Sequence, residues 1–264
     1  MITARSIPEV REALEPDRAA GATIGLVPTM GALHRGHLSL LEAARAENDV
    51  LVMSLFVNPA QFDEQGDLAA YPRDEPADTR AATAAGVDVL FAPPQEEIYP
   101  PGFQTWVEVE EETRGGEGAA RPGHFRGVAT VCLKLFNIVR PTRAYFGQKD
   151  AQQAAVVARL VRDLDLELEL RVLPIVRDAD GLALSSRNAR LSPEERQRAL
   201  ALPRALESAR SAPDRVAAAR AALNGLEPEY VELRKLGEAT VLAAAVRVGS
   251  TRLIDNVLVE GELP

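Results

Sequence analysis

Cysteine, histidine and lysine are scarce in this chain of 264 residues, which has one, three and three of them. One cysteine cannot form an internal disulfide, so we expect a reducing compartment, the cytoplasm. The N-terminal stretch is mixed and charged and does not resemble a signal peptide. No apolar run approaches the roughly 20 residues that span a bilayer, so we expect no membrane-spanning segment.

Positive charge is also in deficit, because 39 acidic residues outnumber 30 lysines and arginines and the net charge is −9. This balance argues against broad binding to nucleic acid or to a membrane surface. An anionic substrate would therefore need a local cationic pocket. The hydrophobic share of 46% and the charged share of 26% fit a globular protein with a sizeable core, in one large domain or two.

Strand-like and helix-like stretches alternate along the first two thirds of the chain. Apolar runs predict strands at 22–27, 50–57, 87–92, 144–146 and 166–172, and periodic stretches predict helices at 38–44, 75–85, 128–139 and 150–162. We expect Asp150 to cap the last helix. This alternation predicts an α/β fold, a doubly wound parallel sheet covered on both faces. Ligands of such sheets bind at the carboxyl ends of the strands.

The pattern changes near Pro174. Beyond it we expect a small α+β unit, with helices at 193–210 and 214–223 and strands at 231–233 and 253–259. We therefore predict two domains, 1–174 and 175–264. Before the boundary, the glycine-rich segment 113–123 predicts a mobile loop, and a plain surface loop is the alternative.

The run Pro28-Thr29-Met30-Gly31-Ala32-Leu33-His34-Arg35-Gly36-His37 joins a predicted strand to a predicted helix. The first turn of a helix leaves backbone N–H groups unpaired and its dipole favours negative charge, so this turn is a candidate phosphate site. Gly31 and Gly36 let the chain bend and let a ligand approach the backbone. His34 and His37 could donate hydrogen bonds to phosphate oxygens. The alternative is an incidental pair or a metal site, although zinc would need a third protein ligand.

The run Phe146-Gly147-Gln148-Lys149-Asp150 also lies where a predicted strand becomes a helix. Lys149 at that point is a good counter-charge for a phosphate. Gln153 lies near the same surface, three residues past Asp150. The alternative is a surface ion pair between Lys149 and Asp150.

Three further polar groups are candidates. The run Leu184–Asn188 contains two hydroxyls and a guanidinium, which together can hold a pyrophosphate or can simply cap the next helix. Asn58 and Gln61 follow a predicted strand and could orient a carboxylate or hydroxyl, or could form a turn. Arg121 and His124 offer a cation and an imidazole, or anchor a loop.

In their order along the chain, these motifs resemble those of the pantothenate synthetase family. The matching motifs are Pro-Thr-Met-Gly-Ala-Leu-His-x-Gly-His, Asn-Pro-x-Gln-Phe, Arg-Pro-x-His-Phe, Phe-Gly-x-Lys-Asp-x-Gln-Gln, Gly-Leu-x-x-Ser-Ser-Arg-Asn and the late segment Arg252–Asn256. The family belongs to a wider group of His-x-Gly-His nucleotidyl-transferring enzymes. The chain departs from its pattern at Arg35, Gln148 and Leu184, where an acid, Glu and Met are usual.

The resemblance implies a Rossmann-like fold and an ATP-dependent condensation of pantoate with β-alanine to pantothenate. The reaction would pass through a pantoyl adenylate and release AMP and pyrophosphate. ATP would be the co-substrate, Mg²⁺ would bind mainly through the nucleotide phosphates, and the family suggests a homodimer. Residues 1–174 would bind nucleotide and pantoate, and residues 175–264 would cover the active site.

The resemblance also implies roles for individual residues. His37 is the principal catalytic histidine, beside His34 and Lys149, and Asp78 is an indirect helper of Mg²⁺. The expected ATP-binding residues are Met30, Gly31, Ala32, Leu33, His34, Arg35, Gly36, His37, Gly147, Gln148, Lys149, Asp150, Val176, Leu184, Ser185, Ser186 and Arg187. The expected pantoate and β-alanine residues are Gln61, Gln153, Asn58, Arg121 and His124.

Two other functions would share part of this pattern. A related nucleotidyltransferase would keep His-x-Gly-His but transfer AMP to a phosphorylated acceptor, with no need for β-alanine. A non-catalytic regulatory protein would bind the nucleotide only. Pyrophosphate release that requires both pantoate and ATP would separate these possibilities.

Overall fold

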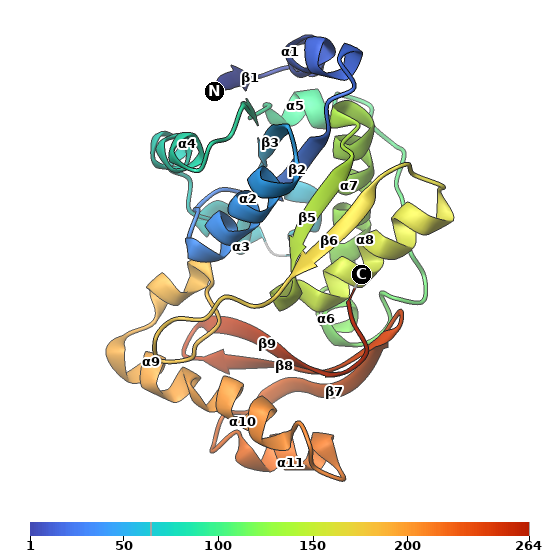
Figure 1. Ribbon diagram of the computed structural model, residues 1–264. Helices are drawn as coiled ribbons and strands as arrows, with labels where there is room; N and C mark the ends of the chain where they lie inside the picture. The colour runs from blue at the N-terminus through green and yellow to red at the C-terminus, as the bar shows by residue number, and fades with distance from the viewer. Residues whose placement is uncertain (64, 264) are drawn as a thin grey trace.

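The computed structural model describes residues 1–63 and 65–263, and two sheets dominate this part of the chain (Figure 1). The larger sheet is parallel throughout, with the strand order β1-β4-β3-β2-β5-β6. Its strands are β1 (Ile2–Ala4), β2 (Ile24–Thr29), β3 (Val50–Leu55), β4 (Val89–Phe91), β5 (Arg143–Gly147) and β6 (Glu169–Leu173). The predicted parallel α/β sheet is confirmed.

Helices cover both faces of this sheet. On one face, α1 (Ile7–Ala19), α7 (His124–Val139) and α8 (Ala151–Asp163) bury apolar side chains against the strands. On the other face, α2 (Arg35–Glu47) and α4 (Glu75–Ala84) do the same. Short helical turns lie at Pro59–Gln61, Gln65–Ala70 (α3), Gln95–Ile98 (α5), Gly116–Ala120 (α6) and Gln148–Asp150.

The strand order reverses at β2, and this reversal places the site. From β2 the chain continues to β3 and β4 on one side, whereas β5 and β6 lie on the other. A crevice forms outside the carboxyl ends of strands at such a reversal. The turn that contains His34 and His37 follows β2, and the turn that contains Lys149 follows β5, so both open onto that crevice.

The smaller sheet is an antiparallel meander of β7 (Pro228–Leu236), β8 (Ala239–Val248) and β9 (Thr251–Glu260). Helices α9 (Pro193–Ala199), α10 (Ala201–Ala209) and α11 (Arg215–Ala222) pack on one face around their own apolar core. Its other face meets α8 through Ala151 and Ala155. Figure 1 shows this meander below the carboxyl edge of the parallel sheet, so it closes one side of the crevice.

Several predicted boundaries differ from the structure. Strand β2 runs through Pro28 to Thr29, because β5 pairs with β2 only at Gly25 and Leu26 and needs no N–H from the proline. The single helix predicted at 193–210 is two helices that meet at Leu200. Strand β8 was not predicted, since its alanine-rich run lacks a clear period.

Two local features differ from the prediction. The segment 113–123, predicted as a mobile loop, contains the short helix α6 over residues 116–120 and buries the side chain of Glu117, and its mobility stays a prediction. Asp150 precedes α8, but its side chain makes no capping hydrogen bond and pairs with Lys149 instead. Across residues 1–63 and 65–263, no helix combines the length and apolar character that crossing a membrane would need.

Candidate active site

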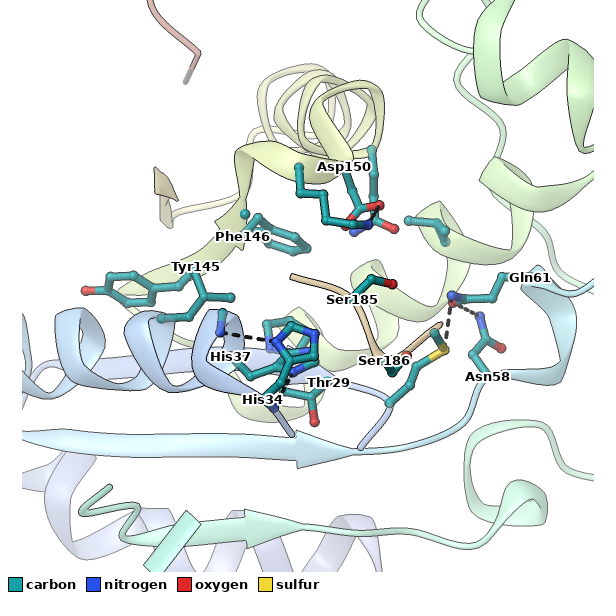
Figure 2. A pocket seen from close by; sticks show the side chains of 18 of the residues that line it. Thr29, His34, His37, Asn58, Gln61, Tyr145, Phe146, Asp150, Ser185 and Ser186 are labelled. Atoms are coloured by element: carbon teal, nitrogen blue, oxygen red, sulfur yellow. Dashed lines mark hydrogen bonds and ion pairs between the residues drawn. The ribbon is translucent and has the colours of Figure 1, made fainter. Parts of the chain in front are cut away.

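A cavity of about 240 Å³ lies in the crevice between the ends of β2 and β5. Figure 2 shows His34 and His37 on one side of it and Asp150 on the other, with Ser185 between them and Ser186 on the side of the histidines. A wider cleft of about 660 Å³ adjoins it toward the small sheet. Both hollows are lined by Arg121, Lys149, Asp150, Ser185 and Arg187.

The two imidazoles form an N-terminal cap for α2. The backbone N–H of Gly36 donates to Nδ1 of His34 at 3.1 Å, and the backbone N–H of His34 donates to Nδ1 of His37 at 3.3 Å. A ring nitrogen that accepts carries no proton, so the proton of each neutral ring lies on Nε2. Each histidine therefore has one N–H available to donate.

Both imidazoles are neutral near pH 7. Burial, with a smaller effect of His34, lowers the pKa of His37 to about 3. Burial and the Lys149 ammonium lower the pKa of His34. The rings lie 4.1 Å apart between centroids, which also disfavours two positive charges. The site thus presents neutral N–H donors, which suit hydrogen bonds to phosphate oxygens without a change of protonation.

The turn before these histidines is fixed by Asp78 of α4. Its buried carboxylate accepts the backbone N–H groups of Ala32 at 3.0 Å and Leu33 at 2.8 Å. Gly31 adopts a left-handed φ of 84°, and a Cβ there would lie 2.6 Å from the Asp78 carboxylate. Since Asp78 already occupies these two N–H groups, they are not free for a ligand.

The positive charges of the cavity are held by acidic neighbours. Lys149 Nζ lies 3.4 Å from Asp150, and Arg187 lies 2.8 Å from Asp67. Burial opposes ionisation of Asp150, yet the Lys149 ammonium keeps its pKa below the ordinary value. The Arg187 guanidinium likewise lowers the pKa of Asp67 against the effect of burial. The oxygens of an anionic ligand would replace these carboxylates as the partners of Lys149 and Arg187.

An amide network forms the other end of the cavity (Figure 2). Asn58 is buried, and its Nδ2 donates to Gln61 at 3.0 Å and to the Gly127 carbonyl at 3.1 Å. The Asn58 carbonyl accepts from the Tyr99 hydroxyl at 2.9 Å. Gln61 Nε2 points to the Met30 sulfur at 3.2 Å, which is a weak acceptor. The side-chain amide of Asn58 is thus hydrogen-bonded to protein partners, whereas the Gln61 amide has an N–H group that could donate to a ligand.

Arg121 and His124 lie beside Gln61. His124 Nδ1 is 2.8 Å from the Gln61 carbonyl oxygen, so this nitrogen carries the proton, and Arg121 donates to the same oxygen at 3.1 Å. Burial and the Arg121 guanidinium lower the pKa of His124 to about 4. Both side chains are part of the cavity wall, and Arg121 lies within the segment 113–123, for which the sequence predicted a mobile loop.

Most of the predicted site residues line this one cavity. They are Met30, His34, Gly36, His37, Asn58, Gln61, Arg121, His124, Gly147, Lys149, Asp150, Gln153, Val176, Leu184, Ser185, Ser186 and Arg187. Five do not line it: Gly31, Ala32, Leu33, Arg35 and Gln148. The first three shape the turn held by Asp78, Arg35 is exposed, and Gln148 bonds to Asn256.

Sequence reasoning missed several residues of the wall. Asp67 lines the wider cleft and pairs with Arg187, and Tyr71 and Thr29 line the cavity. Thr29 belongs to the predicted turn with His34 and His37 but was given no role, whereas Asp67 and Tyr71 follow no predicted strand, so only folding brings them to the site. Cys132 lines the cavity too, and burial raises the pKa of its thiol to about 12. The thiol stays protonated and is therefore no nucleophile.

The chain is similar to known enzymes along nearly its whole length. The family model described as pantoate-beta-alanine ligase matches residues 2–258. The pantothenate synthetase of Moorella thermoacetica is 50% identical, over 97% of this chain and 98% of that protein. The crystal structure of pantothenate synthetase from Thermus thermophilus is 45% identical, with a TM-score of 0.92 over 99% of this chain and 100% of that one.

A second solved structure that the chain resembles is that of the pantoate-beta-alanine ligase from Francisella tularensis, complexed with beta-gamma ATP and beta-alanine. It is 36% identical to this chain, with a TM-score of 0.86 and full coverage of both chains. The protein described here therefore belongs to the pantoate-beta-alanine ligase family of enzymes, the pantothenate synthetases.

Proposed function

We propose that this enzyme joins pantoate to β-alanine at the expense of ATP, through a pantoyl adenylate. The observation that carries the proposal is the convergence of neutral histidine donors, Lys149, Arg187 and the Gln61 amide on one cavity at the strand reversal. The ligands named for the Francisella ligase, an ATP compound and β-alanine, support the same substrates here.

The first step has a clear chemical reason. A carboxylate acylates poorly, because an oxide would have to leave. Attack of a pantoate carboxylate oxygen on the α-phosphorus of ATP forms a mixed anhydride and breaks the bond to pyrophosphate. Charge then develops on the α-phosphoryl oxygens and on the leaving group. Lys149 and the Nε2–H groups of His34 and His37 would donate to the former, and positioning and charge stabilisation supply the catalysis.

Pyrophosphate departure would draw on the loop that contains Ser185, Ser186 and Arg187. Two hydroxyls and a guanidinium provide donors for several phosphate oxygens, and a guanidinium can bind two of them at once. Gly147, Asp150, Val176 and Leu184 line the same part of the cavity and would contact the nucleotide.

The second step needs an amine at the acyl carbon. The β-alanine nitrogen attacks that carbon, the bond to the AMP oxygen breaks, and AMP leaves. Gln61 and Gln153 would hold pantoate through its hydroxyls and carboxylate, with Arg121 and His124 as neighbours of either substrate. Asn58 would act by holding Gln61 in place.

We expect Mg²⁺ to enter with the nucleotide. Among residues 1–63 and 65–263, no group of three or more His, Cys, Asp or Glu is arranged to hold a metal ion. An ion bound largely through phosphate oxygens and water needs few protein ligands. The carboxylates beside that phosphate region are Asp67 and Asp150, and Asp78 is committed to the turn.

The proposal extends to organisation. We expect residues 1–174 and 175–264 to act as two domains, with the second closing over the nucleotide, and a cytoplasmic location stays a prediction. A homodimer is supported by Trp106, which is 42% exposed in an aromatic cluster with Tyr99 and Phe103. Light scattering should give twice the mass of the chain, and a lower mass for Trp106→Glu.

Pyrophosphate release tests the proposed function. With ATP and pantoate but no β-alanine, one pyrophosphate per site should appear rapidly, and β-alanine should convert this burst into continuous turnover. Omission of pantoate should abolish the release. Release without pantoate, or none with both substrates, would contradict the proposal.

A further inference from the structure

Two adjacent residues of β9, Asp255 and Asn256, connect the small sheet to the active site. Their side chains are buried, with 2% and 3% exposure, although neither is apolar. Buried polar groups need partners inside the protein. Both find them in the two segments that carry the catalytic groups, and neither side chain lines the cavity with the histidines.

Asn256 clamps the turn that carries Lys149. Its Nδ2 donates to the carbonyl oxygens of Gln148 at 2.9 Å and Lys149 at 3.0 Å, and its Oδ1 accepts from Gln148 Nε2 at 3.2 Å. Because two carbonyl oxygens face the same nitrogen, the amide can take only this orientation. The backbone of Lys149 is thus fixed by the small sheet, across more than 100 residues of chain.

Asp255 holds the second segment. Its carboxylate accepts two hydrogen bonds from Arg177, at 2.7 and 3.1 Å, and one from the Asn256 backbone at 2.8 Å. Arg177 also donates to the Gly181 carbonyl at 3.3 Å, and its backbone forms a bridge with Ala183. The hairpin that this bridge closes, residues 177–183, leads directly into Leu184 and the Ser185–Arg187 loop.

We infer that Asp255 and Asn256 are positioning residues, which set how Lys149 faces the Ser185–Arg187 loop. Neither lines the cavity with the histidines, and Asp255 borders the adjoining wider cleft with a carboxylate that Arg177 already binds. They would act by holding the two segments at a fixed separation, so that the α-phosphate and the leaving pyrophosphate meet their donors together. The inference rests on the proposed function, and it makes adenylation depend on the small sheet.

Asn256→Asp tests the clamp, because it keeps the shape and replaces the donor by an acceptor. We expect pyrophosphate release in single turnover to slow by about 100-fold, since small misplacements cost that much, while the KM for ATP changes less than about threefold. Asn256→Ala serves the same purpose if the aspartate variant does not fold. Val257→Ala, next along β9 in the small sheet's own core, should lower the melting temperature but keep the rate.

A double-mutant cycle with Lys149→Ala separates positioning from general damage. If Asn256 acts through Lys149, its substitution should change the rate less than about threefold once Lys149 is gone. Reactions followed for hours resolve such slow rates. Equal fold losses in both backgrounds, or a wild-type rate for the folded Asn256 variant, would overturn the inference. Absence of pyrophosphate release from the unmodified enzyme would instead contradict the proposed function.

Discussion

Lys149→Ala is the substitution with the largest expected effect. The ammonium lies in the cavity wall, and a preorganised donor in such a site stabilises the transition state by about 3–4 kcal/mol, or about 10²–10³ in rate. The substitution also leaves the Asp150 carboxylate, 3.4 Å away, without its counter-charge. That carboxylate would repel the nucleotide phosphates, so we expect a loss of at least about 10³.

A second variant isolates the contribution of this repulsion. Lys149→Ala with Asp150→Asn removes the uncompensated charge and should recover about tenfold, equivalent to about 1.4 kcal/mol. Both variants should fold, because the pair is partly exposed and such pairs contribute at most about 1 kcal/mol. Lys235→Ala, an exposed lysine of β7, controls for the change in net charge.

Quench-flow measurement of pyrophosphate release, with enzyme in excess, reports the adenylation step itself. We expect a wild-type rate for Lys235→Ala and a loss of at least about 10³ for Lys149→Ala. The double variant should be about tenfold faster than Lys149→Ala. Near wild-type release by Lys149→Ala would remove this residue from the mechanism. An unchanged rate when Asp150→Asn is added would refute the repulsion.

Three other predictions address different parts of the site. Gln61→Ala should weaken the binding of pantoate by about 1.5–3 kcal/mol and leave the binding of ATP unchanged in titration calorimetry. An equal loss of ATP binding would show that Gln61 does not belong to the pantoate site. Asp78→Asn should deprive the turn of one acceptor and cost about 1–3 kcal/mol in urea unfolding, with unchanged stability as the contrary result. His37 and His124 have pKa values of about 3 and 4, below the ordinary value near 6.5, so the unfolded chain binds protons first and stability falls as the pH drops below about 6.5. Each should cost about 2 kcal/mol at pH 5, and unfolding curves that do not change between pH 8 and 5 would show that the rings are not buried and neutral.

The sequence predicted the parts of the site that depend on local chemistry. A strand followed by Gly31, His34, Gly36 and His37 has few structural solutions, and the structure puts this turn at the strand reversal. The sequence predicted Lys149 as a site residue on the same kind of pattern, because its run also joins a predicted strand to a helix. The parallel sheet followed from alternation, because apolar runs separated by helices bury both faces of a sheet.

The missing parts depend on contacts between distant segments. Asp67 faces Arg187, Glu117 faces Arg252, and Asn256 faces Gln148, each across more than 100 residues. No local pattern marks such partners. The same limit explains why α6 was not predicted within 113–123, whose glycines suggested a mobile loop. There the Arg252 guanidinium binds the Glu117 carboxylate with two hydrogen bonds and anchors α6 to the small sheet.

Transfer of an oxygen label tests the central claim most directly. If the pantoate carboxylate attacks the α-phosphorus, one of its oxygens stays with that phosphorus when the amine takes the acyl group. Pantoate labelled with ¹⁸O in the carboxylate should therefore yield AMP that contains one ¹⁸O atom, with unlabelled pyrophosphate. Label in inorganic phosphate, or AMP without label in a reaction that forms pantothenate, would contradict the adenylate mechanism.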